Sequence, residues 1–177
     1  MNRISTKKMT LNGLMIALVF LTTYFTKIPG PVGPFNIGDA AIMVAAILLG
    51  KNSGFFSGAF GSAVADVAMG YGIFAPVTFI VKGLEGYLIG LIASDTGAGR
   101  KAEWVRMVGV IVGAAVMISG YFIAETFVLR FIDPAFGMAK AIEDLPFNLV
   151  QGAVSSVIGY AISTVLVRVN VRKHLLD

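Results

Sequence analysis

Six long apolar runs, separated by short polar segments, constrain the fold of this chain more than any other feature of its sequence. They cover residues 9–25, 37–49, 54–69, 76–93, 104–129 and 147–167. A transmembrane helix needs about 20 mainly apolar residues, so the runs predict six transmembrane helices. Only 14% of the residues are charged, against about 25% in soluble domains, which excludes an ordinary soluble enzyme. We therefore predict an all-α integral membrane protein in which residues 1–177 form a single membrane-embedded domain.

The second run is short for a transmembrane helix. Residues 37–49 would form a helix only about 20 Å long, whereas the hydrocarbon core of a bilayer is about 30 Å thick. We expect that this helix either begins earlier, near Phe35, or is shielded from lipid by its neighbours.

The distribution of Lys and Arg indicates the orientation of the predicted helices. If the amino terminus is cytoplasmic, ten of the 14 basic residues fall on the cytoplasmic side, and Lys27, Arg130 and Lys140 fall outside or at the outer boundary. The ten are Arg3, Lys7, Lys8, Lys51, Arg100, Lys101, Arg106, Arg168, Arg172 and Lys173. Cytoplasmic loops carry an excess of Lys and Arg, so we predict that both termini are cytoplasmic. The net charge of +4 then reflects topology, and we expect no nucleic-acid partner.

The prolines agree with this orientation. All six fall in the three segments assigned to the outside, where they can stiffen loops and start helices. They are Pro29, Pro31, Pro34, Pro76, Pro134 and Pro146. Structured outer loops, against short inner ones, suggest that the outer face recognises a ligand.

Four side chains that can carry a charge lie inside the predicted helices: Asp66, Lys82, Glu85 and Glu125. Such groups are costly in hydrocarbon and are candidate functional residues. All four fall about 6 to 13 Å from the outer helix ends, at 1.5 Å per residue. The other polar residues that we place in this outer layer are Asn36, Asp39, Tyr71, Tyr121, Asn148 and Gln151. The layer is the candidate ligand-binding site.

Structural interpretations of these residues stay open. Lys82 and Glu85 have the i,i+3 spacing of an ion pair on one helix face, which neutralises itself. Asp66 can cap a loop or reach outer water, and Asn148 or Gln151 can cap the start of a helix.

The sequence contains no motif of a familiar hydrolase or ATPase. It lacks H-E-x-x-H, G-x-S-x-G and G-x-x-x-x-G-K-[ST], and it has one His and no Cys. We therefore expect no enzymatic activity, no metal site and no cofactor. Energy from nucleotide hydrolysis must come from a partner protein.

Four segments carry a family resemblance: FNIGDAAIMVAAILLGKNSG (35–54), GAFGSAVADVAMGY (58–71), APVTFIVKGLEGYLIGLIA (75–93) and NLVQGAVSSVIGY (148–160). They resemble the substrate-binding S components of energy-coupling factor (ECF) vitamin transporters. Within these, the chain is most similar to the riboflavin-type group, which includes predicted hydroxymethylpyrimidine and pyridoxine transporters. The resemblance covers nearly the whole chain.

The resemblance implies a multi-pass protein of a prokaryotic plasma membrane, with six helices and both ends inside. Such a subunit binds a vitamin in an outward-facing pocket. It then docks onto a membrane coupling (T) subunit driven by two cytoplasmic ATPases, so that ATP is used only by the partners. The A-x-x-x-A motif that the family carries on its first helix corresponds here to Gly13 and Ala17, two small residues that permit close helix packing.

For the site, we expect ligand contacts from Lys82, Glu85, Glu125, Asn148 and Gln151. We expect Asn36, Asp39 and Tyr71 to form a lid over the ligand. A small polar heteroaromatic ligand, such as pyridoxine or hydroxymethylpyrimidine, suits a pocket with acids, amides and an aromatic wall, and riboflavin is the next choice. Two alternatives remain: a stand-alone carrier driven by an ion gradient, and a scaffold whose buried charges only pair internally.

Overall fold

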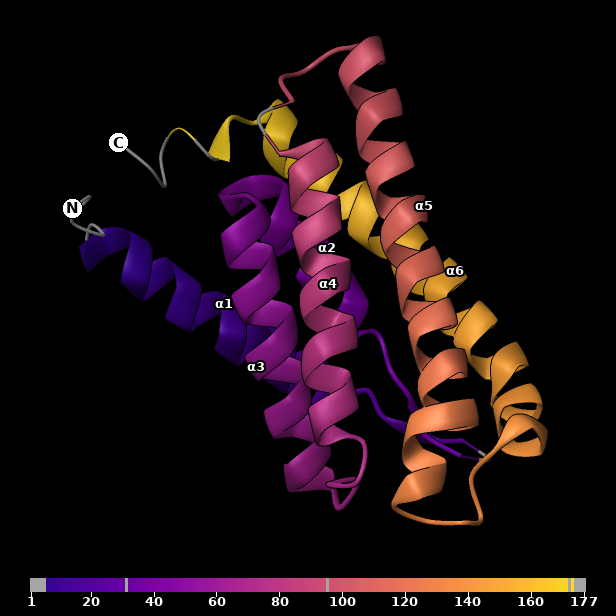
Figure 1. Cartoon of the computed structure of the whole chain (residues 1–177). Helices are drawn as coiled ribbons and strands as arrows, with labels where there is room; N and C mark the ends of the chain where they lie inside the picture. Colours follow the sequence, from indigo (N-terminus) through magenta and orange to yellow (C-terminus); the bar gives the residue numbers. More distant parts are fainter. Residues whose placement is uncertain (1–5, 31, 95, 172, 174–177) are drawn as a thin grey trace.

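The computed structural model describes residues 6–30, 32–94, 96–171 and 173 (Figure 1). The predictions at Arg3, Pro31 and Arg172, and both ends of the chain, lie outside these residues. The described part forms six α-helices, a two-stranded hairpin and two short irregular helices. In order they are α1 (Thr6–Phe25), β1 (Ile28–Pro29), β2 (Pro34–Phe35), α2 (Gly38–Leu49), α3 (Lys51–Met69), α4 (Ala75–Ala93), α5 (Arg100–Ile123), η1 (Ala124–Val128), η2 (Leu129–Phe131) and α6 (Met138–Arg168).

The helices form a bundle in which successive members run in opposite directions (Figure 1). α3 packs along α4 and α1, α4 also packs against α5, and α5 packs against α6. The small antiparallel hairpin of β1 and β2 extends toward the ends of α5 and α6, and β2 contacts α6. The hairpin therefore joins the first half of the chain to the last helix.

α2 lies at the centre of the bundle, in contact with α1, α3, α4 and α6. It begins at Gly38, and all 12 of its residues are buried. Of the two expectations for this short helix, the earlier start near Phe35 is wrong, and shielding by neighbours is confirmed. The chain turns directly into α3 at Gly50, whose φ of +92° lies in a region that glycine adopts without steric cost.

Among the described residues, four helical segments are long and apolar enough to cross a membrane: α1, α4, the continuous stretch from α5 to η2, and α6. α2 is a shorter apolar helix. Large apolar side chains such as Leu14, Ile80, Ile111 and Val157 point outward from these helices. An exposed apolar surface of this kind suits lipid rather than water, in agreement with an all-α integral membrane protein.

α6 differs most from its predicted boundaries. It begins at Met138, nine residues before the expected start at residue 147, and contains Pro146. The preceding segment MAKAIEDL is rich in residues that favour helix, and this preference outweighs the backbone hydrogen bond lost at the proline. Asn148 and Gln151 therefore lie well inside the helix rather than in its first turns.

Glycines set the spacing between α3 and α4. A Cβ atom on Gly86 would meet the backbone carbonyl of Gly54, and one on Gly58 would meet the carbonyl of Lys82. These small residues thus serve internal packing, as small residues do at close helix contacts in membranes. Gly13 on α1 differs, because a Cβ atom placed on it would have no neighbouring atom within 4 Å, and both it and Ala17 are exposed.

Candidate functional site

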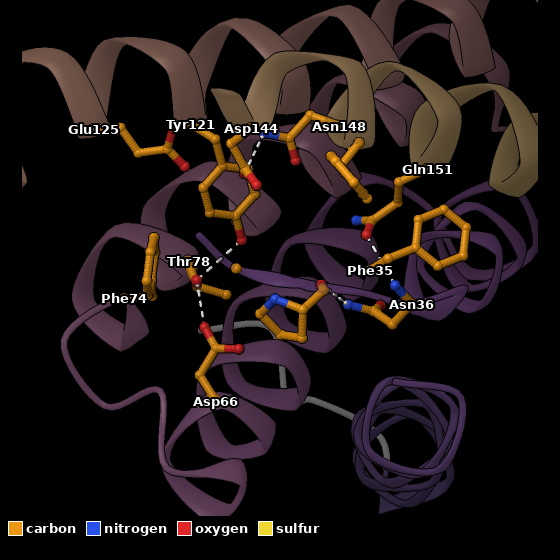
Figure 2. Close-up of a pocket in the computed structure, with 13 residues that line it drawn as sticks. Phe35, Asn36, Asp66, Phe74, Thr78, Tyr121, Glu125, Asp144, Asn148 and Gln151 are labelled. Atoms are coloured by element: carbon orange, nitrogen blue, oxygen red, sulfur yellow. Dashed lines mark hydrogen bonds between the residues drawn. The ribbon is translucent and has the colours of Figure 1, made fainter. Parts of the chain in front are cut away.

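A small cavity lies where the hairpin meets α4, α5 and α6 (Figure 2). Its free volume is about 40 Å³. The lining residues are Gly33, Pro34, Phe35 and Asn36 from the hairpin segment, Asp66, Phe74 and Thr78 from α3, α4 and the loop between them, Tyr121 and Glu125 from α5 and η1, and Asp144, Phe147, Asn148 and Gln151 from α6. Acids, amides and aromatic rings therefore surround one space.

The early start of α6 creates one wall of the cavity. Asp144, Phe147, Asn148 and Gln151 follow one another at positions i, i+3, i+4 and i+7, the spacing of residues on one helix face. The Asn148 Nδ2 donates a hydrogen bond of 2.9 Å to Asp144 Oδ2 (Figure 2). Asn148 does not cap the helix, because it lies ten residues inside it.

The opposite wall includes a change in helix type. α5 gives way to a single π-helical segment, η1, which buries Ala124, Glu125 and Thr126. Segments of this kind are rare and occur frequently at functional sites. The π turn places Glu125 on the cavity, and only 1% of this residue is exposed.

A hydrogen-bonded chain connects α3, α4 and α5 at the floor of the cavity. The Thr78 hydroxyl donates to Asp66 Oδ2 at 2.5 Å and lies 3.0 Å from the Tyr121 hydroxyl (Figure 2). Asp66 thus has a protein partner and is buried, so it neither caps a loop nor reaches outer water.

Lys82 is the centre of a buried ionic network behind the cavity. Its Nζ donates to Asp39 Oδ1 on α2, lies 3.3 Å from Glu85 Oε2 on the same helix, and sits 5.5 Å from the ring centroid of Tyr121. Lys82 is 3% exposed, and both of its acidic partners are buried as well. The i,i+3 pairing of Lys82 with Glu85 is therefore present in the structure.

Gln151 connects this network to the cavity and to the hairpin. Its Nε2 donates to Asp39 Oδ2 at 3.0 Å, and its Oε1 accepts the backbone N–H of Asn36, also at 3.0 Å. Because Asp39 also binds Lys82, the amide of Gln151 on α6 is held in place by residues of two other helices, α2 and α4. The segment at Asn36 is held against α6 by the same side chain (Figure 2).

Six of the ten predicted site residues line the cavity: Asn36, Asp66, Tyr121, Glu125, Asn148 and Gln151. Asp39, Lys82 and Glu85 come together behind it and do not line it. Tyr71 packs against the apolar cluster around Phe74 and Val77.

Sequence reasoning missed Asp144, Thr78, Phe35, Phe74 and Phe147 as lining residues. For Asp144 a signal existed, because its spacing from Asn148 and Gln151 marks one helix face. Because the helix was predicted to start at residue 147, directly after Pro146, Asp144 fell outside the predicted helix.

Three carboxylate oxygens of the cavity have no hydrogen-bond partner among the residues that the structure describes. They are both oxygens of Glu125 and Oδ1 of Asp144. Buried polar atoms are normally paired, so these oxygens mark the place where a bound molecule can supply hydrogen-bond donors.

Comparison with known proteins gives a consistent result. A family model described as "ECF-type riboflavin transporter, S component" matches residues 3–168. An uncharacterized protein of Pyrococcus woesei is 34% identical over 151 residues, which cover 84% of this chain and 93% of that protein. The thiamine precursor transporter HmpT of Lactococcus lactis is 29% identical over 168 residues, covering 93% and 90% of the two chains. The family is one of transporter components rather than enzymes, and this chain belongs to it: it is a member of the ECF-type riboflavin transporter S component family.

Proposed function

We propose that this protein is the substrate-specific binding subunit of an ATP-driven importer. It captures a small water-soluble vitamin or vitamin precursor from outside the cell and delivers it by docking with a membrane coupling subunit and two cytoplasmic ATPases. The observation that carries this proposal is the buried cavity between the hairpin and α4 to α6, with its acids, amides and aromatic rings. Family membership supports the same function.

The orientation belongs to the proposal too. We place all six α-helices in the plasma membrane of a prokaryote, with both termini in the cytoplasm, because the excess of Lys and Arg falls on that side. The cavity then lies near the outer end of the bundle. A ligand reaches it from outside without first crossing the membrane.

The lining favours a small heteroaromatic ligand. Aromatic side chains of Phe35 and Phe74 can cover a ring, while Asn148 and Glu125 offer polar contacts, a combination typical of small-molecule sites. The relative HmpT is named a transporter of a thiamine precursor. A hydroxymethylpyrimidine-like or pyridoxine-like molecule is the best candidate, and riboflavin, which needs a longer apolar slot, is the next.

Ligand entry requires one wall of the cavity to move. A volume of about 40 Å³ holds only a few water molecules, whereas small-molecule pockets measure about 300 to 1,000 Å³. The segment from Gly33 to Asn36 is the wall outside the helix bundle, and its link to α6 is the hydrogen bond from Asn36 to Gln151. We assign the lid to this segment and a positioning role to Asp39, Lys82 and Glu85.

The docking face that we propose is the outward side of α1. Gly13 and Ala17 are both exposed there, and Leu14 beside them is exposed as well. Small residues one turn apart allow a partner helix to approach closely.

Binding is tested with purified protein in detergent. Its thermal stability is measured against a panel of water-soluble vitamins and their precursors, because a ligand that binds only the folded state raises the melting temperature. We expect one compound to raise it at micromolar concentration. Folded protein that responds to no member of the panel would contradict the proposal.

Glu125→Gln tests the site itself. This change keeps the shape of the side chain but replaces one carboxyl oxygen with an NH2 group that cannot accept a hydrogen bond, and we expect it to weaken ligand binding about tenfold or more. The matched control is Glu143→Gln, an exposed carboxyl on α6 that does not line the cavity, and it should bind as the wild type does. Equal affinity in both variants would remove Glu125 from the site.

Uptake by reconstituted liposomes separates this function from a stand-alone carrier. We expect transport only when the coupling subunit, both ATPases and ATP are present. Uptake by the chain alone that follows a proton gradient would support the carrier instead.

A further inference from the structure

Glu125 and Asp144 form an acidic pair to which the described residues supply few hydrogen-bond donors. The two carboxyl groups are neighbours that come from different elements, η1 and α6. They are only 1% and 4% exposed, and both line the cavity (Figure 2). Three of their four oxygens lack a partner among the described residues.

We propose that this acidic pair is a subsite for an amino group of the ligand. The protein then takes a pyrimidine or pyridine that carries an amino group, in preference to an otherwise identical molecule with a hydroxyl or oxo group in its place. This inference rests on the proposed function and narrows its substrate class.

The cavity itself offers no positive charge to the pair. None of its 13 lining residues is Lys, Arg or His. Lys82 is the nearby buried cation, but its ammonium group is held by Asp39 and Glu85 behind the cavity. A bound molecule can therefore supply the donors that the lining side chains do not offer to the three free oxygens.

The neighbouring side-chain donors of the protein each have a partner already, although each amide nitrogen keeps a second N–H. Asn148 Nδ2 donates to Asp144 Oδ2, and Gln151 Nε2 donates to Asp39. The hydroxyls of Thr78 and Tyr121 form a chain that ends on Asp66. The three free oxygens thus remain as acceptors that face the cavity.

The number of hydrogen-bond donors on a ligand determines how strongly the protein prefers it. An amino group presents two N–H donors, or three when protonated, and can bond to carboxyl groups on both sides of it. A hydroxyl group presents one donor, and an oxo group presents none and brings a further acceptor against the acids. Because only the amino group can donate to both carboxyl groups at once, the amino compound gains most from this pair.

Matched ligand pairs test the proposal directly. The first pair is hydroxymethylpyrimidine with its ring amino group and the analogue in which an oxo group replaces the amine. The second is pyridoxamine and pyridoxine, which differ in one amino and one hydroxyl group. Affinities are measured by titration calorimetry on purified wild type and on the variants Glu125→Gln and Asp144→Asn, with Glu143→Gln as the exposed control.

For the wild type and Glu143→Gln, we expect the amino member of at least one pair to bind about tenfold or more tightly than its partner. In Glu125→Gln and Asp144→Asn, we expect this preference to shrink toward unity. Asp144→Asn also changes the bond to Asn148, so gel filtration and the melting temperature are used to confirm that it folds. Glu125 has no such bond, so its variant keeps the test valid if Asp144→Asn does not fold.

Each of the following results would overturn the proposal. Equal binding of both members of each pair would show that the two carboxyl groups do not recognise the amino group. A preference for the amino compound that persists in the two variants would show the same. Preference for the hydroxyl or oxo compound would indicate that the two carboxyls share a proton with each other. If riboflavin or another vitamin without an amino group is the ligand that binds, the subsite is wrong but the importer function stands. If no water-soluble vitamin binds folded protein, the proposed function fails as well.

Discussion

Lys82 shows how single residues hold the polar layer of this protein together. Its spacing from Glu85 predicted an ion pair on one helix, and the structure contains that pair. Its stronger contact, Asp39, lies 43 positions away in the sequence. The spacing of residues within one helix cannot reveal a partner on another helix, because that partner depends on how α2 and α4 pack against each other. For the same reason, the sequence grouped Lys82 and Glu85 with the other polar residues but did not show that they lie behind the cavity.

Replacing Lys82 should therefore cost far more stability than replacing an exposed lysine. Lys82→Met leaves two buried carboxyl groups without their cation, and removing one partner of a buried pair costs about 3–5 kcal/mol. The control is Lys140→Met, which breaks the ion pair between Lys140 and Glu143. The Lys140 side chain is 40% exposed, and ion pairs on the surface contribute about 0–1 kcal/mol to stability. Free energies of unfolding in detergent give the comparison. Similar losses in both variants would show that the buried network contributes little.

At the scale of elements, the sequence predicted the helices well and their ends less well. The apolar runs located each of the six α-helices that the structure describes. They did so because each helix presents apolar side chains both to its neighbours and to the outside of the bundle. The start of α6 and the π turn at Glu125 were not predicted. The π turn depends on local competition between backbone hydrogen bonding and packing, which leaves no periodic signal. The start of α6 was missed because Pro146 was taken as the helix boundary. The early start of α6 places Asp144 on the cavity, so the error in this boundary became an error in the site. Glu125 was predicted as a site residue although the π turn was not.

The glycines of α3 and α4 lead to a prediction about helix packing. A Cβ atom on Gly86 would meet the backbone of Gly54, and backbone cannot move aside without separating the two helices. We expect Gly86→Ala to destabilise the protein by about 1–3 kcal/mol, the usual cost of overpacking. Gly13→Ala is the control, because its new methyl group has no neighbour within 4 Å and alanine favours helix by up to about 1 kcal/mol. The melting temperatures of both variants are compared with that of the wild type. A Gly86→Ala protein as stable as the wild type would contradict the close contact.

In the molecule as a whole, the cavity and the exposed small residues of α1 lie on different elements. The cavity is formed by the hairpin and α3 to α6, whereas the exposed small residues lie on α1. Helix α1 contributes no lining residue to the cavity. If α1 is the docking face, as we propose, ligand binding and docking should be separable by mutation.

Ala17→Leu tests this separation. The larger side chain projects from the exposed face of α1 and should prevent close approach of a partner helix. We expect it to abolish co-purification with the coupling subunit and the ATPases, while ligand affinity stays at the wild-type value because the cavity is untouched. The matched control is Ala161→Leu, the same change at an exposed position of α6, which should assemble normally. Assembly of Ala17→Leu at the wild-type level would move the docking face away from α1, and loss of assembly in both variants would show that added bulk, rather than this position, is responsible.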